Sequence, residues 1–171
     1  LKATGLPKHR VIGMGGALDS SRFKYYLSKA LDKPANDVQG MVIGGHGDTT
    51  MIPLIGHATW NSIPVTNFLT EAQQQQIIAD TMVGGATLTK LLGTSAWYAP
   101  GAAAAQMVEA IVRDQKRIFP VCAWLTGQYG LNNLYMGAPV KLGRHGIESI
   151  IELHLNEAEM ALVNDSAKAV R

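Results

Sequence analysis

The chain has 171 residues, which is enough to bury one sizeable hydrophobic core, so a single domain is the expectation. Its formal net charge of +2 argues against a nucleic-acid surface, and its longest charge-free stretches contain prolines and polar residues, which argues against a membrane span. Charged residues make up only 16% of the chain, which indicates a surface that a partner domain or another subunit covers.

Residues 1–8 are predicted to form a connector, because Gly5 and Pro7 favour turns. The chain begins with Leu1 rather than Met, so we expect it to continue a longer chain. A short strand is predicted over residues 10–12, and a glycine loop over residues 13–16.

This glycine loop is not predicted to hold a phosphate. Leu18 stands where the dinucleotide fingerprint needs its third glycine, and no acidic residue follows about twenty positions later at the end of a second strand. We expect the loop to pass close to a flat ligand instead.

A helix is predicted from Asp19 and Ser20 to Leu31, ending before Pro34. Asp19 and Arg22 are three residues apart and therefore share one face of this helix. Taken alone, the pair is typical of an N-capping aspartate with a local ion pair.

An apolar strand is predicted over residues 38–44, leading into the loop Gly44-Gly45-His46-Gly47-Asp48. Glycines on both sides leave the imidazole unshielded at the end of the strand, which is where open α/β sheets tend to place ligands. Another short strand is predicted over residues 50–55, and Pro53 indicates an edge or an irregular stretch.

Two long helices follow. Thr70 is predicted to begin the first, which Gly93 ends and which Gly84-Gly85 is expected to bend or interrupt. The second is predicted over residues 97–113, and its alanines at 102–105 permit close packing against another helix.

The apolar period then changes to two, which predicts three strands of an antiparallel meander over residues 117–125, 134–142 and 146–153. Cys122 lies in the first strand and is predicted to be a buried, inert thiol. As the only cysteine, it excludes an internal disulfide framework and favours a reducing, cytoplasmic compartment. Asn156 is predicted to cap a last helix over residues 157–170, with its apolar residues Met160, Leu162 and Val163 facing inward.

Two stretches together resemble the lactate/malate dehydrogenase family: Leu18-Asp19-Ser20-Ser21-Arg22-Phe23 and Gly44-Gly45-His46-Gly47-Asp48. The resemblance continues through Trp97-Tyr98-Ala99-Pro100 and Gly127-Gln128-Tyr129-Gly130 to the last helix, and it is to the second half of such an enzyme. It implies an α+β fold with helices packed on antiparallel sheets over residues 1–171. It also implies that a parallel dinucleotide-binding domain precedes residue 1.

The resemblance also implies the roles of three residues: His46 is the acid/base, Asp19 its carboxylate partner, and Arg22 the clamp on the substrate carboxylate. Histidine suits proton donation to a carbonyl oxygen near neutral pH, and the planar guanidinium suits a carboxylate. Asp48 is the alternative partner of His46, although its position favours a role in tying down its own loop by accepting backbone N–H bonds.

By the same resemblance, the cofactor is NAD, Met14 and Pro100 contact its nicotinamide, and Ala96 belongs to the substrate pocket. The expected substrates are malate and oxaloacetate, because Gly45 precedes His46 and Pro100 follows Tyr98-Ala99. Lactate is the alternative. The complete enzyme is expected to be a homo-oligomer, and this chain alone is expected to bind NADH weakly and to show no turnover.

Two readings from other classes remain open. His46-Gly47-Asp48 is similar to the His-x-Asp of zinc peptidases, but no Glu-Glu pair follows, so no metal site is predicted. The chain could instead be a non-catalytic dimerisation and substrate-binding module, which its low charge supports. An NAD-dependent absorbance change would distinguish that module from an enzyme. The remaining histidines are predicted to be solvated, capping or loop residues: His9, His57, His145 and His154.

Overall fold

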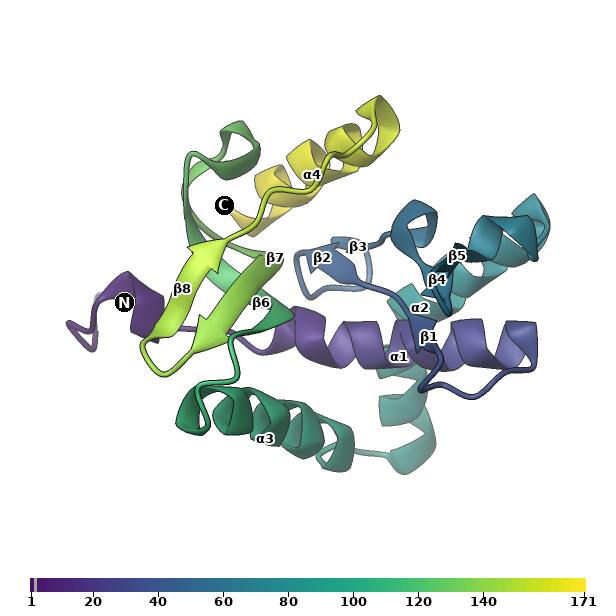
Figure 1. The fold of residues 1–171 in the computed structure, drawn as a ribbon, viewed down its shortest axis with the longest axis horizontal. Helices are drawn as coiled ribbons and strands as arrows, with labels where there is room; N and C mark the ends of the chain where they lie inside the picture. The colour runs from purple at the N-terminus through teal and green to yellow at the C-terminus, as the bar shows by residue number, and fades with distance from the viewer. Residues whose placement is uncertain (2) are drawn as a thin grey trace.

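The computed structural model describes Leu1 and residues 3–171 and shows helices packed on antiparallel sheets (Figure 1). The predicted α+β class is confirmed. The helices of the described residues are α1 (Gly15–Leu31), α2 (Glu71–Leu92), α3 (Tyr98–Val112) and α4 (Glu157–Val170), with short 3-10 turns η1 (Lys8–Arg10), η2 (Ile55–His57), η3 (Val65–Asn67) and η4 (Gln128–Gly130).

The larger sheet is built on the predicted meander. Its strands are β6 (Arg117–Thr126), β7 (Asn132–Gly143) and β8 (Gly146–Ile150), and β8 ends three residues earlier than expected. Burial alternates in the second half of β6, because successive side chains point to opposite faces of a strand, whereas residues 136–140 in the middle of β7 are buried without a break. Helix α3 packs Met107 and Ala110 against this buried face.

Two short strands extend the sheet on the side of β7. Strand β2 (Val42–Gly44) pairs with β7 through Gly44 and Gly137, and β3 (Met51–Pro53) pairs with β2 at the edge. The edge position that Pro53 predicted is confirmed.

The single strand predicted over residues 38–44 is wrong, because the chain divides there between two sheets. β1 (Val38–Gln39) joins β4 (Thr59–Trp60) and β5 (Ile63–Pro64) in a separate small sheet. Gly40 marks the division, since a Cβ there would come within 2.8 Å of Phe23 in α1. No local sequence pattern predicts this sheet, because its strands have only two residues each.

The beginning of α1 also differs from the prediction. There is no strand over residues 10–12, and only the second half of the predicted glycine loop, Gly15 and Gly16, belongs to the first turn of α1. Gly13 precedes the helix and forms an isolated bridge with Cys122 of β6. A Cβ on Gly16 would lie 2.6 Å from the carbonyl oxygen of Pro120 and 2.9 Å from that of Val42. Gly16 is therefore needed for close packing of the helix on two strands. The approach of this segment to a flat ligand stays a prediction.

The other helix predictions hold with two corrections. Thr70 and Asn156 form capping boxes at the starts of α2 and α4, and Gly93 ends α2 in a left-handed conformation. Helix α2 runs without interruption through Gly84-Gly85. In α4, Val163 is buried as predicted but Leu162 is 53% exposed, because it lies outside the inward stripe that Val163 shares with Ser166 and Ala167.

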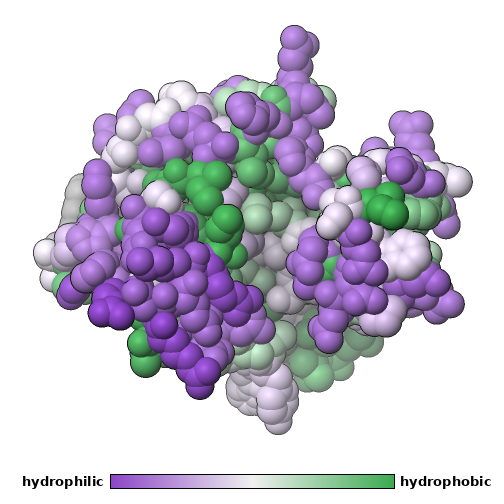
Figure 2. Space-filling model, in the orientation of Figure 1, coloured by the Kyte–Doolittle hydropathy of each residue, from purple (hydrophilic) through white to green (hydrophobic). Residues whose placement is uncertain are grey.

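Several large apolar side chains remain exposed around the end of α2 and along α3. They are Leu88, Leu91, Leu92, Trp97, Tyr98, Val108 and Val112. On the face shown in Figure 2, apolar residues also gather between two largely hydrophilic areas. Within the described part of the chain, no helix is both long and apolar enough to cross a membrane.

Cys122 is half-buried, and desolvation by burial raises the pKa of its thiol, which disfavours the reactive thiolate.

Candidate active site

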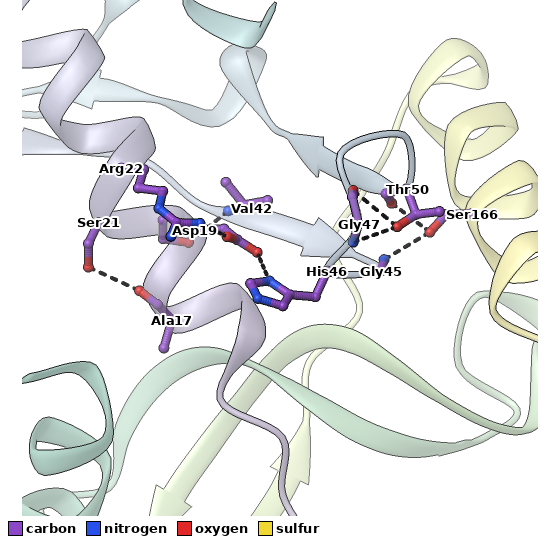
Figure 3. Close-up of polar contacts among 11 residues, drawn as sticks. Ala17, Asp19, Ser21, Arg22, Val42, Gly45, His46, Gly47, Thr50 and Ser166 are labelled. Atoms are coloured by element: carbon purple, nitrogen blue, oxygen red, sulfur yellow. Dashed lines mark hydrogen bonds and ion pairs between the residues drawn. The ribbon is translucent and has the colours of Figure 1, made fainter. Parts of the chain in front are cut away.

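Three of the residues singled out by sequence meet where α1 passes the loop between β2 and β3. Nδ1 of His46 lies 2.6 Å from Oδ2 of Asp19, and Nη1 of Arg22 donates a hydrogen bond of 3.1 Å to Oδ1 of the same carboxylate (Figure 3). Asp19 and His46 are 27 positions apart in sequence, so the fold creates this pair. One carboxylate is thus shared between an imidazole and a guanidinium.

Asp19 is fully buried, although it was considered as a helix cap. The helix begins four positions earlier, at Gly15, so the capping interpretation is wrong while the ion pair with Arg22 is present. Desolvation raises the pKa of the Asp19 carboxyl above its ordinary value. The hydrogen bond and charge of His46, followed by Arg22, act in the opposite direction.

The His46 side chain is 56% exposed, in contrast to its buried partner. Because Nδ1 faces Asp19, Nε2 on the opposite edge of the ring is the nitrogen available to a ligand. Gly15 makes this position possible, since a Cβ there would lie 3.1 Å from Cβ of His46 and 3.4 Å from its Nδ1. The arrangement presents an oriented imidazole that can donate or accept a proton.

The loop that carries His46 is held by residues that sequence reasoning missed. The Thr50 hydroxyl accepts a hydrogen bond of 2.9 Å from the N–H of Gly47, and the Ser166 hydroxyl accepts one of 2.9 Å from the N–H of Gly45. Asp48 was expected to tie down this loop, but it is exposed, and no hydrogen bond or ion pair of its carboxylate occurs within the described residues. A threonine is better placed there, because its hydroxyl both donates to and accepts from the backbone of Gly47.

The guanidinium of Arg22 lies against a bare stretch of α2. A Cβ on Gly85 would come within 3.0 Å of its Nη1 and 3.4 Å of its Nη2, so the glycine at this position makes room for Arg22. Beside it is an open hollow of about 440 Å³, lined mainly by apolar side chains: Leu18, Tyr25, Tyr26, Leu88, Leu91 and Ala99.

The remaining candidates lie further from these contacts. Met14 precedes α1 and packs against the core cluster beneath α3, and Pro100 is half-buried in the first turn of α3. Ala96 is half-buried between α2 and α3, and it does not line the hollow, which Ala99 does. Their contacts with a cofactor or substrate remain predictions.

The other histidines do not join this site. His57 lies 3.6 Å from Glu159, at the start of α4. His9, His145 and His154 are exposed. Across Leu1 and residues 3–171, no group of three or more histidine, cysteine or acidic side chains is placed to hold a metal ion.

The sequence of the chain matches the model of a known protein family. The family described as lactate/malate dehydrogenase, alpha/beta C-terminal domain, matches residues 16–171, so the chain belongs to the lactate/malate dehydrogenase family. The predicted family is thereby confirmed.

Several relatives within this family have sequences similar to that of the chain. The chain is 64% identical over 170 residues to a malate dehydrogenase of Bacteroides thetaiotaomicron, covering 99% of this chain and 54% of that protein. A malate dehydrogenase of Flavobacterium frigidimaris is 61% identical over 171 residues, covering 100% of this chain and 55% of that protein. The chain therefore spans about half the length of the curated relatives it matches.

Solved structures give the same result for the fold. A malate dehydrogenase from Salinibacter ruber superposes with a TM-score of 0.96 at 47% identity, over 99% of this chain and 55% of that one. A lactate dehydrogenase from Eimeria maxima, solved with NADH and oxamate, reaches 0.95 at 42% identity, over 99% of this chain and 53% of that one. The fold alone therefore does not separate malate from lactate enzymes.

The buried Asp19 carboxylate predicts a particular pH dependence of stability. A carboxyl with a higher pKa in the folded than in the unfolded state destabilises the folded state when it ionises, so the free energy of unfolding falls as the pH rises through that interval. Asp19→Asn removes this ionisation. The free energy of unfolding of Asp19→Asn minus that of the wild type should therefore increase from pH 4 to pH 8. Denaturant titration of both proteins measures this difference.

The exposed Asp165 provides the matched control, because Asp165→Asn removes a carboxylate that remains solvated. Its difference from the wild type should change little over the same pH range. A constant difference for Asp19→Asn, or one that shrinks as the pH rises, would contradict the argument.

Proposed function

We propose that this chain is the catalytic and substrate-binding half of an NAD-dependent malate dehydrogenase. The reaction is reversible hydride transfer between malate and NAD, giving oxaloacetate and NADH. The observation that carries the proposal is the contact of 2.6 Å between the exposed His46 and the buried Asp19. The names of the relatives support it, since three relatives that match at above 60% identity are named malate dehydrogenase.

In the direction of ketone reduction, NADH, when bound, would supply the hydride for the new C–H bond at the carbonyl carbon. The carbonyl oxygen gains negative charge as this happens, and Nε2–H of protonated His46 donates its proton there, giving the hydroxyl of the product. Asp19 keeps Nδ1 of the ring on its own side and stabilises the imidazolium. In the reverse direction, neutral His46 accepts the hydroxyl proton.

Arg22 is proposed to bind the carboxylate next to the reacting carbon. Its Nη1 is held by Asp19, while its Nε and Nη2 make no hydrogen bond within the described residues, which leaves donors free for a second carboxylate. The backbone of α2 at Gly85 limits where the guanidinium can lie. A fixed planar fork favours paired hydrogen bonds to a carboxylate.

The described residues fit only the reacting end of NAD. The open edge of His46 leaves space beside the site, where Met14 and Pro100 would contact the nicotinamide. Gly16, by contrast, is closed against the backbone of Pro120 and Val42 and offers no cradle for phosphates. We therefore propose that a dinucleotide-binding domain, joined through residues 1–8, holds the rest of the cofactor, and that this chain alone binds NADH weakly and does not turn over.

The exposed apolar side chains of α2 and α3 support a homo-oligomer in which another subunit or the dinucleotide-binding domain covers them. The single Cys122, with its thiol pKa raised by burial, suits a reducing cytoplasmic compartment.

Malate rather than lactate is proposed as the substrate for two reasons. Gly45 precedes His46, which by resemblance favours the malate-type members of the family over the lactate-type members. Ala99, which lines the hollow beside Arg22, is also small, and so is the neighbouring Ala96, which supports room for a second carboxylate. Lactate is the alternative, because the lactate dehydrogenase of Eimeria maxima has nearly the same fold.

His46→Gln tests the acid/base role in the full-length enzyme. Without a proton donor at the carbonyl oxygen, kcat should fall by about a hundredfold or more. His57→Gln is the matched control, since the His57 imidazole lies 3.6 Å from Glu159 and takes no part in the contacts of His46 and Asp19, so its loss should leave kcat close to wild type. Steady-state oxidation of NADH with oxaloacetate measures both, and wild-type rates for His46→Gln would refute the assignment.

Arg22→Lys tests the carboxylate clamp. Lysine keeps the charge but not the planar fork, so KM for oxaloacetate should rise about tenfold or more, as expected for one charge-assisted hydrogen bond, while NADH affinity changes little. Arg113→Lys, at an exposed ion pair with Glu109, should change neither. Unchanged kinetics together with a lower free energy of unfolding would show that Arg22 serves only its ion pair with Asp19.

A direct comparison of two ketoacids tests the substrate. Oxaloacetate carries a second carboxylate whose recognition in a desolvated pocket is worth a few kcal/mol, so kcat/KM should favour it over pyruvate by about a hundredfold or more. The measurement uses the full-length enzyme with NADH under identical conditions. Equal values, or a preference for pyruvate, would identify a lactate dehydrogenase instead.

A further inference from the structure

Ser166 in α4 makes two hydrogen bonds that join the two ends of the loop carrying His46 (Figure 3). Its hydroxyl accepts from the N–H of Gly45 at 2.9 Å and donates to the carbonyl oxygen of Thr50 at 2.7 Å. The side chain is buried, and it lies 121 positions from Gly45 in sequence. A residue from the end of the chain thus closes the loop beside the proposed acid/base.

The N–H of Gly45 and the carbonyl of Thr50 stand at the two ends of the loop, where it leaves β2 and enters β3. The N–H of Gly45 also donates to the carbonyl oxygen of Thr50 at 3.0 Å, so Ser166 completes a small network around this backbone bond between the two ends. The Thr50 side chain separately holds the tip through Gly47. Since Gly45 directly precedes His46 in the chain, a movement of the Gly45 end of the loop also moves the imidazole.

Helix α4 is held in place by its capping box and by core contacts, so the position of Ser166 is well defined. A capping box at Asn156 and Glu159 sets its start. Val163 and Ala167, on the same face as Ser166, are buried in one core cluster with Ile43 of β2 and Ile52 of β3. The strands that flank the loop and the helix that closes it therefore form one packed unit.

We propose that Ser166 is a positioning residue for His46, a role that rests on the proposed function of this site. By fixing the Gly45 and Thr50 ends of the loop, its hydroxyl keeps Nδ1 of His46 against Asp19 and Nε2 toward the substrate. Arg22 lies on α1, outside this network, so substrate binding does not depend on Ser166. The proposal therefore predicts a loss in kcat rather than in KM.

The chemistry at this position requires a group that donates and accepts at once. A hydroxyl does both, alanine does neither, and a thiol does both only weakly. Ser166→Thr keeps the hydroxyl, whereas Ser166→Ala and Ser166→Cys lose most of its function. Ser28→Ala is the matched control, because Ser28 is also a helical serine whose hydroxyl donates to a backbone carbonyl, that of Lys33, away from the loop.

The experiment measures kcat and KM with oxaloacetate and NADH in the full-length enzyme, together with hydrogen exchange of the Gly45 amide. Ser166→Ala should lower kcat about tenfold, in keeping with a shift of the imidazole smaller than 1 Å, and should leave KM for oxaloacetate within about twofold. The Gly45 amide should exchange faster. Ser166→Thr should restore most of kcat, and Ser28→Ala should change none of these values.

Where Ser166→Ala does not fold, Ser166→Cys carries the same expectation at nearly unchanged side-chain volume. A kcat within about twofold of wild type in the folded variant overturns the proposal, as does an equal loss of kcat in Ser28→Ala. Assaying His46→Gln alongside distinguishes a failure of the positioning role of Ser166 from a failure of the proposed function. Turnover lost in His46→Gln but kept in Ser166→Ala removes only the role of Ser166, whereas turnover kept in His46→Gln refutes the proposed function itself.

Discussion

The site depends on a carboxylate, Asp19, that is held out of water between a guanidinium and an imidazole. Removing an ionised carboxylate from water costs several kcal/mol, which the bonds to Arg22 and His46 partly offset. Desolvation still dominates the pKa of Asp19, which is raised. The fold therefore gives up some stability to hold a charge where it orients and stabilises the proposed acid/base, as is common at functional sites.

Most of the packing around the site serves to bring α1 to the β2–β3 loop. Gly15 and Gly16 let the first turn of α1 lie directly on His46 and on the backbone of two strands. Next to Asp19, the buried Ser20 hydroxyl accepts a hydrogen bond of 2.9 Å from the N–H of Val42 in β2. Helix α1 is thus fixed to the strand that leads into the His46 loop, and the distance between Asp19 and His46 follows from that attachment.

The sequence predicted the elements whose signals are local. Helices α2 and α4 carry capping boxes, and the meander has a clear period of two, so their limits were close to correct. The predicted start of α1 was wrong because Gly15 and Gly16 are typical of a loop. Glycine is needed at these positions because the helix packs there against residues far along the chain. The pairing of Asp19 with His46 came from family resemblance, and Ser166 was missed because no local pattern connects it with Gly45.

The central claim is that the buried Asp19 accepts a hydrogen bond from Nδ1 of His46 and leaves Nε2 free for the substrate. The tautomer of neutral His46 tests this most directly, through a two-bond proton–nitrogen correlation spectrum of the histidine-labelled protein. The account predicts that the single ring proton resides on Nδ1. A proton on Nε2 would contradict it, because Nδ1 would then have no hydrogen to share with Asp19.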